Sequence, residues 1–239
     1  MRYIYGPVKS RRLGLSLGVT LIAYKICSFN CIYCQLGRTQ NLTCERKEYL
    51  KTQEIIGELK LWLAGNPLEA ENLNYITLSG SGEPTLNLRI AELIEEIKKI
   101  TPLPVAVITN SSLLSDALVR NALSSADLIV PSLNTASQVI LAQINRVPEN
   151  IKIKDIIDGL VSLRNEFRGK IWLEVMLVRG VNDDIRQIKK LKEVIVRINP
   201  DKIQLNSPVR ATAEPNVLPV ERKKLEKIKE ILGDKCEIV

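Results

Sequence analysis

Apolar residues along the chain fall into short β-branched runs that alternate with longer segments of helical periodicity. The short runs predict six buried strands, over residues 19–26, 75–79, 105–109, 128–131, 171–178 and 203–205. Apolar positions spaced three and four apart predict helices over residues 52–64, 87–100, 113–123, 135–144, 153–167, 185–198 and 220–232. Strands and helices in strict succession predict an α/β fold, with a parallel sheet and helices outside it.

Six strand-helix units are too few to close an eight-stranded barrel, so we expect an open, partial (β/α)6 TIM-like barrel. Its working face is expected at the C-terminal ends of the strands, where small and polar residues collect. We expect one domain over residues 1–239: an N-terminal segment (1–16), a six-strand core (17–210), and a C-terminal helix and tail (211–239). The tail, from Cys236 to Val239, is expected to form a terminal strand.

Composition narrows the class of protein. The 239 residues are 45% hydrophobic and 26% charged, as in ordinary soluble proteins, and no apolar run is long enough to span a bilayer. The first residues lack the apolar core of a signal peptide, so we expect a cytoplasmic protein. We also expect a monomer or weak dimer. A net charge of +7 permits an RNA partner, although lysine-rich helix faces give the same sum. Abundant Lys, Glu and Ile with no His indicate a thermophile.

Three of the five cysteines, Cys27, Cys31 and Cys34, fall within eight positions. A structural zinc site needs four ligands, and the chain has no histidine and no second cysteine pair. A 4Fe-4S cluster normally takes four thiolates, so three would leave one iron open to a ligand. The alternatives are a cluster used only for electron transfer and a fortuitous group of buried thiols.

A second motif, Gly80-Ser81-Gly82-Glu83-Pro84, follows the second predicted strand. Its two glycines allow the backbone to approach a ligand closely, and Glu83 offers a carboxylate acceptor. An amino acid bound to the open iron would present an ammonium group that needs such acceptors. The structural alternative is a helix-entry turn in which Glu83 favours the helix N-terminus.

The cysteine spacing, with Tyr33 directly before the last cysteine, resembles the signature of the radical S-adenosylmethionine (SAM) enzymes. Over nearly the whole chain the sequence is similar to the small proteins of that superfamily grouped as Fe-S oxidoreductases, chiefly in residues 5–14, 34–39, 79–85 and 172–178. That group is similar, in its core motifs, to the enzymes that form the tricyclic wyosine base of tRNA. Those enzymes carry a longer N-terminal part with further cysteines and a lysine for pyruvate. This sequence departs from them in that part, which argues against the wyosine reaction.

The resemblance implies a 4Fe-4S cluster held by Cys27, Cys31 and Cys34, with SAM on its open iron. It implies cofactor contacts from one set of residues: Tyr33, Gly80, Ser81, Gly82, Glu83, Asn110, Ser132, Asn134, Met176 and Leu205. Within that set, Asn110, Ser132 and Asn134 correspond to positions that meet the ribose and the methionine carboxylate. Met176 and Leu205 correspond to positions that hold adenine. Helix capping and core packing are the competing interpretations, and Tyr33 would alternatively shield the cluster from water.

The resemblance also implies the reaction. The reduced cluster cleaves SAM to methionine and a 5'-deoxyadenosyl radical, which abstracts hydrogen from a small molecule or an RNA base, with a ferredoxin or flavodoxin as electron donor. The alternatives are activation of a glycyl-radical protein and a non-catalytic electron carrier or scaffold. The glycine motif favours an enzyme, because an electron carrier needs no cofactor cradle.

Six arginines fall in predicted loops, where guanidinium groups suit a phosphate or carboxylate: Arg11, Arg12, Arg38, Arg146, Arg179 and Arg210. Of these we name Arg11, Arg12, Arg146 and Arg210 as candidates for substrate binding. Cys44, near the cysteine loop, is a further candidate for a reactive residue or ligand. Cys236 is expected to be a free or partly buried thiol.

Overall fold

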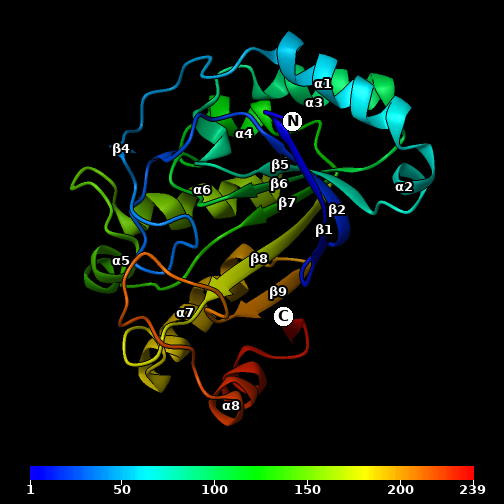
Figure 1. The fold of residues 1–239 in the computed structure, drawn as a ribbon. Coiled ribbons are helices and arrows are strands. Elements are labelled where there is room, and N and C mark those ends of the chain that lie inside the picture. The colour runs from blue at the N-terminus through cyan, green and yellow to red at the C-terminus, as the bar shows by residue number, and fades with distance from the viewer.

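The computed structural model describes residues 1–239 and contains one eight-stranded sheet, in the order β1-β2-β5-β6-β7-β8-β9-β10 (Figure 1). β1 is antiparallel to β2, and every other neighbouring pair is parallel. The strands are β1 (Ile4–Ser10), β2 (Gly14–Thr20), β5 (Tyr75–Ser79), β6 (Val105–Thr109), β7 (Leu128–Pro131), β8 (Lys170–Met176), β9 (Lys202–Asn206) and β10 (Cys236–Ile238). The α/β fold and the open, partial barrel predicted from the sequence are confirmed.

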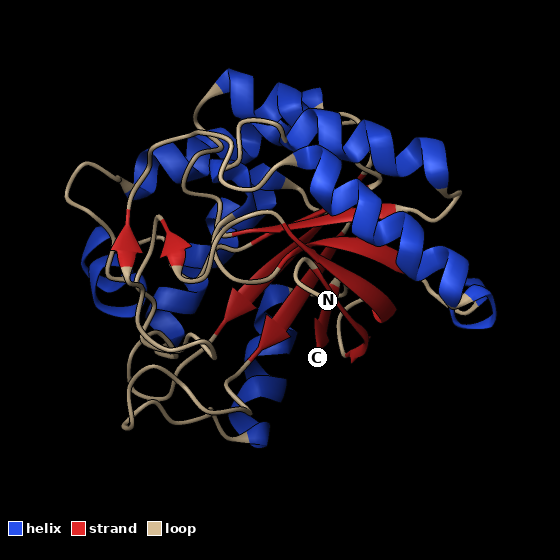
Figure 2. Ribbon diagram, turned by 45° about the horizontal axis from the view of Figure 1, so that its top comes forward, coloured by secondary structure: helices blue, strands red, loops and turns tan.

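Helices lie on the outer side of this sheet, and long loops gather beyond its strand ends (Figure 2). They are α1 (Thr52–Gly65), α2 (Pro67–Glu71), α3 (Ile90–Ile100), α4 (Ala117–Ala122), α5 (Gln138–Asn145), α6 (Ile153–Glu166), α7 (Ile185–Ile198) and α8 (Arg222–Leu232). A 3₁₀ turn covers Pro84–Leu86, and a small parallel pair joins β3 (Ile26–Cys27) to β4 (Asn41–Leu42). No helix is both long enough and apolar enough to cross a membrane.

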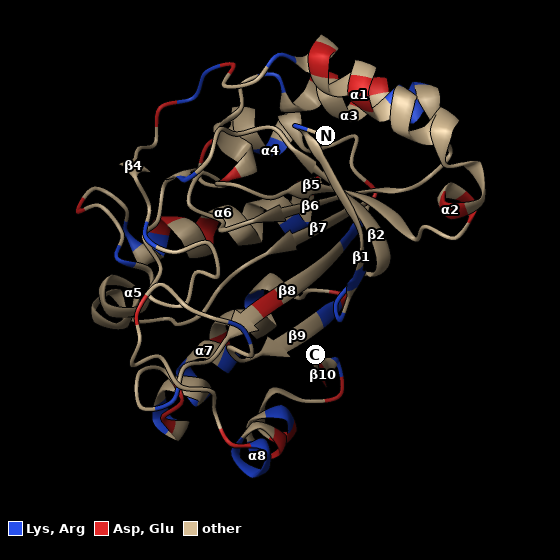
Figure 3. Ribbon diagram, viewed as in Figure 1, with Lys and Arg blue, Asp and Glu red and all other residues tan.

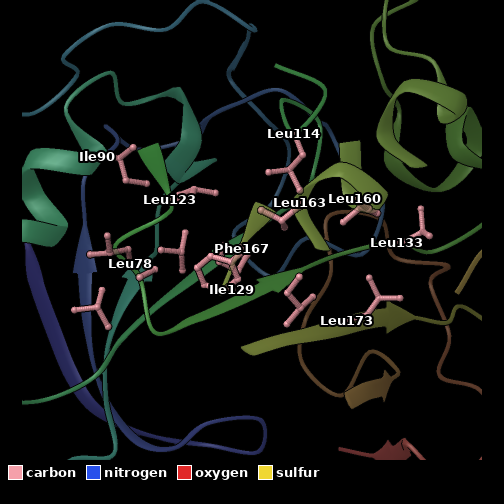
Figure 4. Close-up of a cluster of buried hydrophobic side chains, with 14 of the residues drawn as sticks. Leu78, Ile90, Leu114, Leu123, Ile129, Leu133, Leu160, Leu163, Phe167 and Leu173 are labelled. Carbon is pink, nitrogen blue, oxygen red and sulfur yellow. The ribbon is translucent and has the colours of Figure 1, made fainter. Parts of the chain in front are cut away.

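The main core fills the space between the sheet and the helices. Leu78, Ile129 and Leu173 come from three strands and pack with Leu163 and Phe167 from the region of α6 (Figure 4). All five side chains are almost completely buried, so each contributes roughly 1.5–3 kcal/mol of burial free energy. This packing fixes the strand ends from which the site is built.

Part of the other face of the sheet is covered by the turn that joins β1 to β2. Leu13, in the hairpin turn, packs with Ala106, Leu128 and Val130, whose strand neighbours face the main core. The sequence pattern did not predict β1, because its exposed and buried positions do not alternate. The turn of the hairpin therefore lies against the inner face of the open barrel.

The first predicted strand is misplaced in the sequence analysis, since β2 ends at Thr20 and the chain then turns. Leu21 and Ile22 are buried although they lie outside a strand. A continuous apolar run does not distinguish a buried strand from a buried segment that is not a strand. Four helices also begin later than predicted, α3, α4, α5 and α8. In α4 the reason is local: Asp116 caps the helix by accepting from the Leu118 N–H, so residues 113–116 stay outside it. The terminal strand expected at Cys236 is present as β10.

Candidate functional site

The cysteine loop leaves β3 at Cys27 and is held against the end of α5. The Asn30 N–H donates to the Asn145 carbonyl and the Ile32 N–H to the Ile144 carbonyl, each at 3.0 Å. Cys27, Cys31 and Cys34 are each partly buried. The loop is thus fixed by main-chain hydrogen bonds to the elements behind it.

Each of the three thiols accepts a hydrogen bond from a different nitrogen. Asn110 Nδ2 lies 3.5 Å from Cys27 Sγ, Asn145 Nδ2 lies 3.2 Å from Cys31 Sγ, and Lys25 Nζ lies 3.2 Å from Cys34 Sγ. No three Cys, Asp or Glu side chains are grouped as the ligands of a single metal ion are. A 4Fe-4S cluster spreads its thiolates over separate irons and carries negative charge on sulfur, so these three donors suit it.

Burial strongly raises the pKa of two of the three thiols. It raises the pKa of Cys27 to about 12, with the nearby charge of Glu83 adding to the effect, and it raises the pKa of Cys31 to about 11. Without metal both thiols therefore stay protonated at neutral pH. Iron binding would displace those protons, because the thiolate is the form that binds metal.

The glycine motif forms a turn directly after β5 that packs against the start of the cysteine loop. The Lys25 N–H donates to the Ser81 carbonyl at 2.7 Å, and the Glu83 N–H donates to the Ile26 carbonyl at 3.2 Å. Gly80 has φ +103°, and a Cβ there would lie 2.1 Å from Thr20 Oγ1. The motif therefore shapes the segment that leads into Cys27.

Glu83 is buried, and its carboxylate is fully engaged within the protein. It accepts from Thr85 N–H at 3.1 Å and Thr85 Oγ1 at 2.7 Å, from Thr109 Oγ1 at 2.6 Å, and from Asn110 N–H at 2.7 Å. Burial nevertheless raises its pKa above the ordinary value. The side chain ties the end of β6 to the turn, and so it also positions Asn110 beside Cys27.

Asn134, Asn145 and Tyr33 form a connected polar group beside Cys31. The Tyr33 hydroxyl accepts from Asn134 Nδ2 at 2.8 Å and from Asn145 Nδ2 at 3.0 Å. Asn134 Oδ1 in turn accepts from the Met176 N–H at 2.8 Å. Burial raises the pKa of Tyr33 well above its usual value, so its hydroxyl stays protonated. The structure thus joins three of the predicted cofactor residues, Tyr33, Asn134 and Met176, through hydrogen bonds.

The remaining rim residues are placed differently. Ser132 Oγ donates to Glu174 Oε2 at 3.1 Å, on the neighbouring strand β8. Met176 is partly buried at the end of β8, whereas Leu205 is completely buried and belongs to the main core. For Leu205 the core-packing interpretation accounts for its position without a ligand.

The candidate arginines separate into two groups. Arg12 forms an ion pair with Glu174 at 2.9 Å, and Arg11 donates to Asn206 Oδ1 at 3.0 Å. The hairpin turn thus reaches across to β8 and β9. Figure 3 shows Lys and Arg at the turn end of β1.

The second group lies beside the cysteine loop, around the segment that follows β9. Arg146 and Arg38 both pair with Glu214, at 2.5 and 3.1 Å, and the Glu214 N–H donates to the Ile32 carbonyl. Arg210 donates to Gln35 Oε1 at 3.1 Å. Arg179 is paired outside this group, with Glu221 at 3.8 Å. Charged side chains therefore hold the segment that follows β9 against the cysteine loop.

The two remaining cysteines differ in burial. Cys44 is partly buried and packs against the main core, and burial raises its pKa. Cys236 is buried in β10, where burial raises its pKa to about 12.

Lys25 and Asn145 are contacts of the cysteines that the sequence analysis missed. Asn145 ends α5 and carries no motif signal. Lys25 did carry a signal in the sequence, because it is a charged residue within an apolar run, two positions before Cys27.

Comparison with known proteins agrees with this fold. A family model described as the Radical SAM superfamily matches residues 21–192. The chain belongs to the radical SAM superfamily and, within it, to the group of UPF0026 proteins. It is therefore an enzyme of the class that uses a 4Fe-4S cluster and SAM and needs a reductant.

Three relatives illustrate the range of similarity. A UPF0026 protein of Methanocaldococcus jannaschii is 34% identical over the whole chain, which spans 73% of that protein. A Brachyspira hyodysenteriae protein named GTPase Obg is 39% identical over 98% of the chain, which spans only 34% of its length. A probable dual-specificity RNA methyltransferase RlmN of a Thermotoga species is 26% identical over 79% of the chain and 53% of its own length.

Two solved structures share the fold. A radical SAM methyltransferase from Sphaerobacter thermophilus superposes with a TM-score of 0.71 and 17% identity, covering 94% of this chain and 65% of its own. A TYW1 structure with a lysine-pyruvate adduct superposes with a TM-score of 0.64 and 21% identity, covering 91% of this chain and 72% of its own.

Proposed function

We propose that Cys27, Cys31 and Cys34 hold the 4Fe-4S cluster of this enzyme. The observation that carries the proposal is the separate N–H donor at each sulfur, from Asn110, Asn145 and Lys25. When bound, the reduced cluster supplies one electron that cleaves SAM to methionine and a 5'-deoxyadenosyl radical. The chain's own part is to bind and orient the cofactor and to keep water from it.

The proposed SAM site lies along the polar rim next to these cysteines and comprises the residues inferred from the sequence, apart from Leu205, which packs in the main core. Because the Glu83 carboxylate is already engaged, the carbonyl oxygens of Gly80 and Gly82 are the better acceptors for the ammonium group. Neither carbonyl accepts a hydrogen bond within the protein. Asn134 and Tyr33 fix the neighbouring part of the rim through the hydrogen bonds described above.

Anaerobic reconstitution with iron and sulfide tests the cluster assignment, with 5'-deoxyadenosine measured after dithionite reduction in the presence of SAM. Cys31→Ala is expected to lose both iron and product. Cys236→Ala is the matched control, since it removes a buried thiol in β10 and is expected to retain both. A Cys31→Ala protein with full iron content and product would refute the assignment.

For the substrate, we propose an RNA base from which the radical abstracts hydrogen. The net charge of +7 supports an anionic partner, and the similarity to an RNA methyltransferase favours RNA among the anionic partners. A ferredoxin or flavodoxin is the proposed electron donor, and the cytoplasm the proposed location.

Adding total tRNA or ribosomal RNA to the reduced enzyme and SAM is expected to accelerate 5'-deoxyadenosine formation. The same RNA digested with nuclease to nucleosides is the control. Binding of the intact RNA is expected to weaken steeply as salt increases, because phosphate contacts release counterions. Acceleration by a nucleic-acid-free metabolite extract, or by a glycyl-radical protein, would replace the RNA proposal with one of those substrates.

A further inference from the structure

Lys25 is a buried lysine whose ammonium group faces a proposed cluster ligand. The residue is 3% exposed, and its Nζ lies 3.2 Å from Cys34 Sγ, the acceptor of its one side-chain hydrogen bond. The ammonium forms no ion pair with any carboxylate, although fifteen ion pairs occur elsewhere in the chain. Lysine is almost never fully buried unless it is paired, so this position calls for a negative partner.

The backbone around Lys25 is held on both sides. Its N–H donates to the Ser81 carbonyl at 2.7 Å, and its carbonyl accepts from the N–H groups of Gln40 and Asn41, each at 3.1 Å. Lys25 also has φ +58°, in the left-handed region that residues other than glycine seldom adopt. These restraints, from the glycine turn and from β4, fix the direction in which the side chain leaves the loop.

An ammonium group has three donors, and the structure supplies one acceptor, a sulfur atom. A cluster held by Cys34 would add thiolate and sulfide charge at the same place, and so would provide the missing negative partner. Asn110 and Asn145, the donors at the other two cysteines, are neutral. Lys25 is therefore the one full positive charge among the three donors.

We propose that Lys25 is a positioning residue that raises the reduction potential of the cluster through its charge beside Cys34. The inference rests on the proposed assignment of Cys34 as a cluster ligand. Reduction adds one electron, from a low-potential one-electron donor, and so adds one negative charge to the cluster. A fixed positive charge stabilises the reduced form more than the oxidised form, because Coulomb energy scales with the charge on the cluster.

The test is an anaerobic redox titration of the reconstituted protein, followed by electron spin resonance of the reduced cluster. Lys25→Met and Lys25→Gln remove the charge, and each is expected to shift the reduction equilibrium at least tenfold toward the oxidised form. That factor corresponds to a potential lower by about 59 mV for a one-electron couple. Lys25→Arg keeps the charge and is expected to stay near the wild-type potential.

Lys60→Met, on the exposed side of α1, removes one lysine charge from the surface and controls for net charge. Its potential is expected to equal that of the wild type. Equal potentials for wild type, Lys25→Met and Lys25→Gln, each with full iron content, would overturn the inference and leave the cluster assignment intact. A wild-type cluster signal that survives Cys34→Ala unchanged would instead overturn the assignment, and the inference with it.

Discussion

The carbonyl oxygen of Ile26 lies 1.8 Å from the point where a Cβ atom on Gly82 would stand. The glycine turn and the residue before Cys27 therefore pack backbone against backbone, with the Glu83 N–H bonded to the same Ile26 carbonyl. Neither backbone moves without disturbing the other, so the second glycine of the motif has a structural role in shaping the cysteine loop.

Gly82→Ala is accordingly expected to displace the start of the cysteine loop. Overpacking against main chain costs about 1–3 kcal/mol, and we expect a loss of that size in the free energy of urea unfolding, together with lower iron content after reconstitution. Gly57→Ala is the matched control, because a Cβ at this position in α1 meets nothing within 4 Å. The control is expected to gain about 0.5–1 kcal/mol. A Gly82→Ala protein with wild-type stability and iron content would contradict this account.

Features that depend on local pattern could be predicted from the sequence. Five of the parallel strands, β5 to β9, follow from short β-branched runs, and the cysteine group and glycine turn follow from spacing within one loop. The individual cofactor contacts and the thermophilic origin stay predictions.

Features that depend on distant partners could not be predicted. The Arg12–Glu174 pair joins the N-terminal hairpin to β8, and the Asn145–Cys31 contact joins the end of α5 to the cysteine loop. No periodicity records such pairs, because each is fixed only when the sheet and its helices have packed. The engagement of the Glu83 carboxylate is hidden for the same reason, since Thr109 and Asn110 reach it from β6.

Asn145→Leu tests the polar group behind the cysteine loop. The side chain is 2% exposed and donates to both Cys31 Sγ and the Tyr33 hydroxyl, so a leucine leaves buried polar atoms with fewer partners. We expect a loss of about 1–3 kcal/mol in unfolding free energy and a lower iron content. Asn121→Leu, at an exposed position of α4, is expected to change the unfolding free energy by no more than about 0.5 kcal/mol and to leave the iron content unchanged. Equal losses in the two variants would show that the hydrogen bonds of Asn145 contribute nothing specific.

The Arg12–Glu174 pair is expected to couple the hairpin to the inner face of the sheet. Their side chains are 25% and 10% exposed, so breaking the pair leaves a largely desolvated charge, and Glu174→Leu alone is expected to cost about 2 kcal/mol. In a double-mutant cycle with Arg12→Met, we expect a coupling energy of about 1–2 kcal/mol from urea unfolding. The exposed pair Lys154–Asp158 on α6 should give a much smaller coupling energy in the same cycle, because solvent screens it. Similar coupling for the two pairs would mean that the hairpin is not held by this contact.

Glu58 predicts a pH dependence for the docking of β1. Its carboxylate on α1 accepts from the N–H groups of Arg2, Tyr3 and Ile4, at 3.0, 2.9 and 2.9 Å. Partial burial acts to raise its pKa, but these three hydrogen bonds outweigh burial and leave the pKa below the ordinary value. Because the folded-state pKa is depressed, the carboxylate stabilises the fold fully above the unfolded pKa of about 4.3, and this contribution disappears as the pH falls through the lower folded value.

Glu58→Gln keeps the shape of the side chain and removes its charge. We expect the wild type to be more stable by about 1–2 kcal/mol at pH 7, and the difference to shrink as the pH falls below about 4. Urea unfolding of both proteins in the same cluster-free form, at pH 7, 5 and 3.5, measures the difference directly. Hydrogen exchange should locate it in β1, whose amides open first when the three bonds to Glu58 weaken. A difference that stays constant across this pH range would show that the charge of Glu58 does not hold the strand.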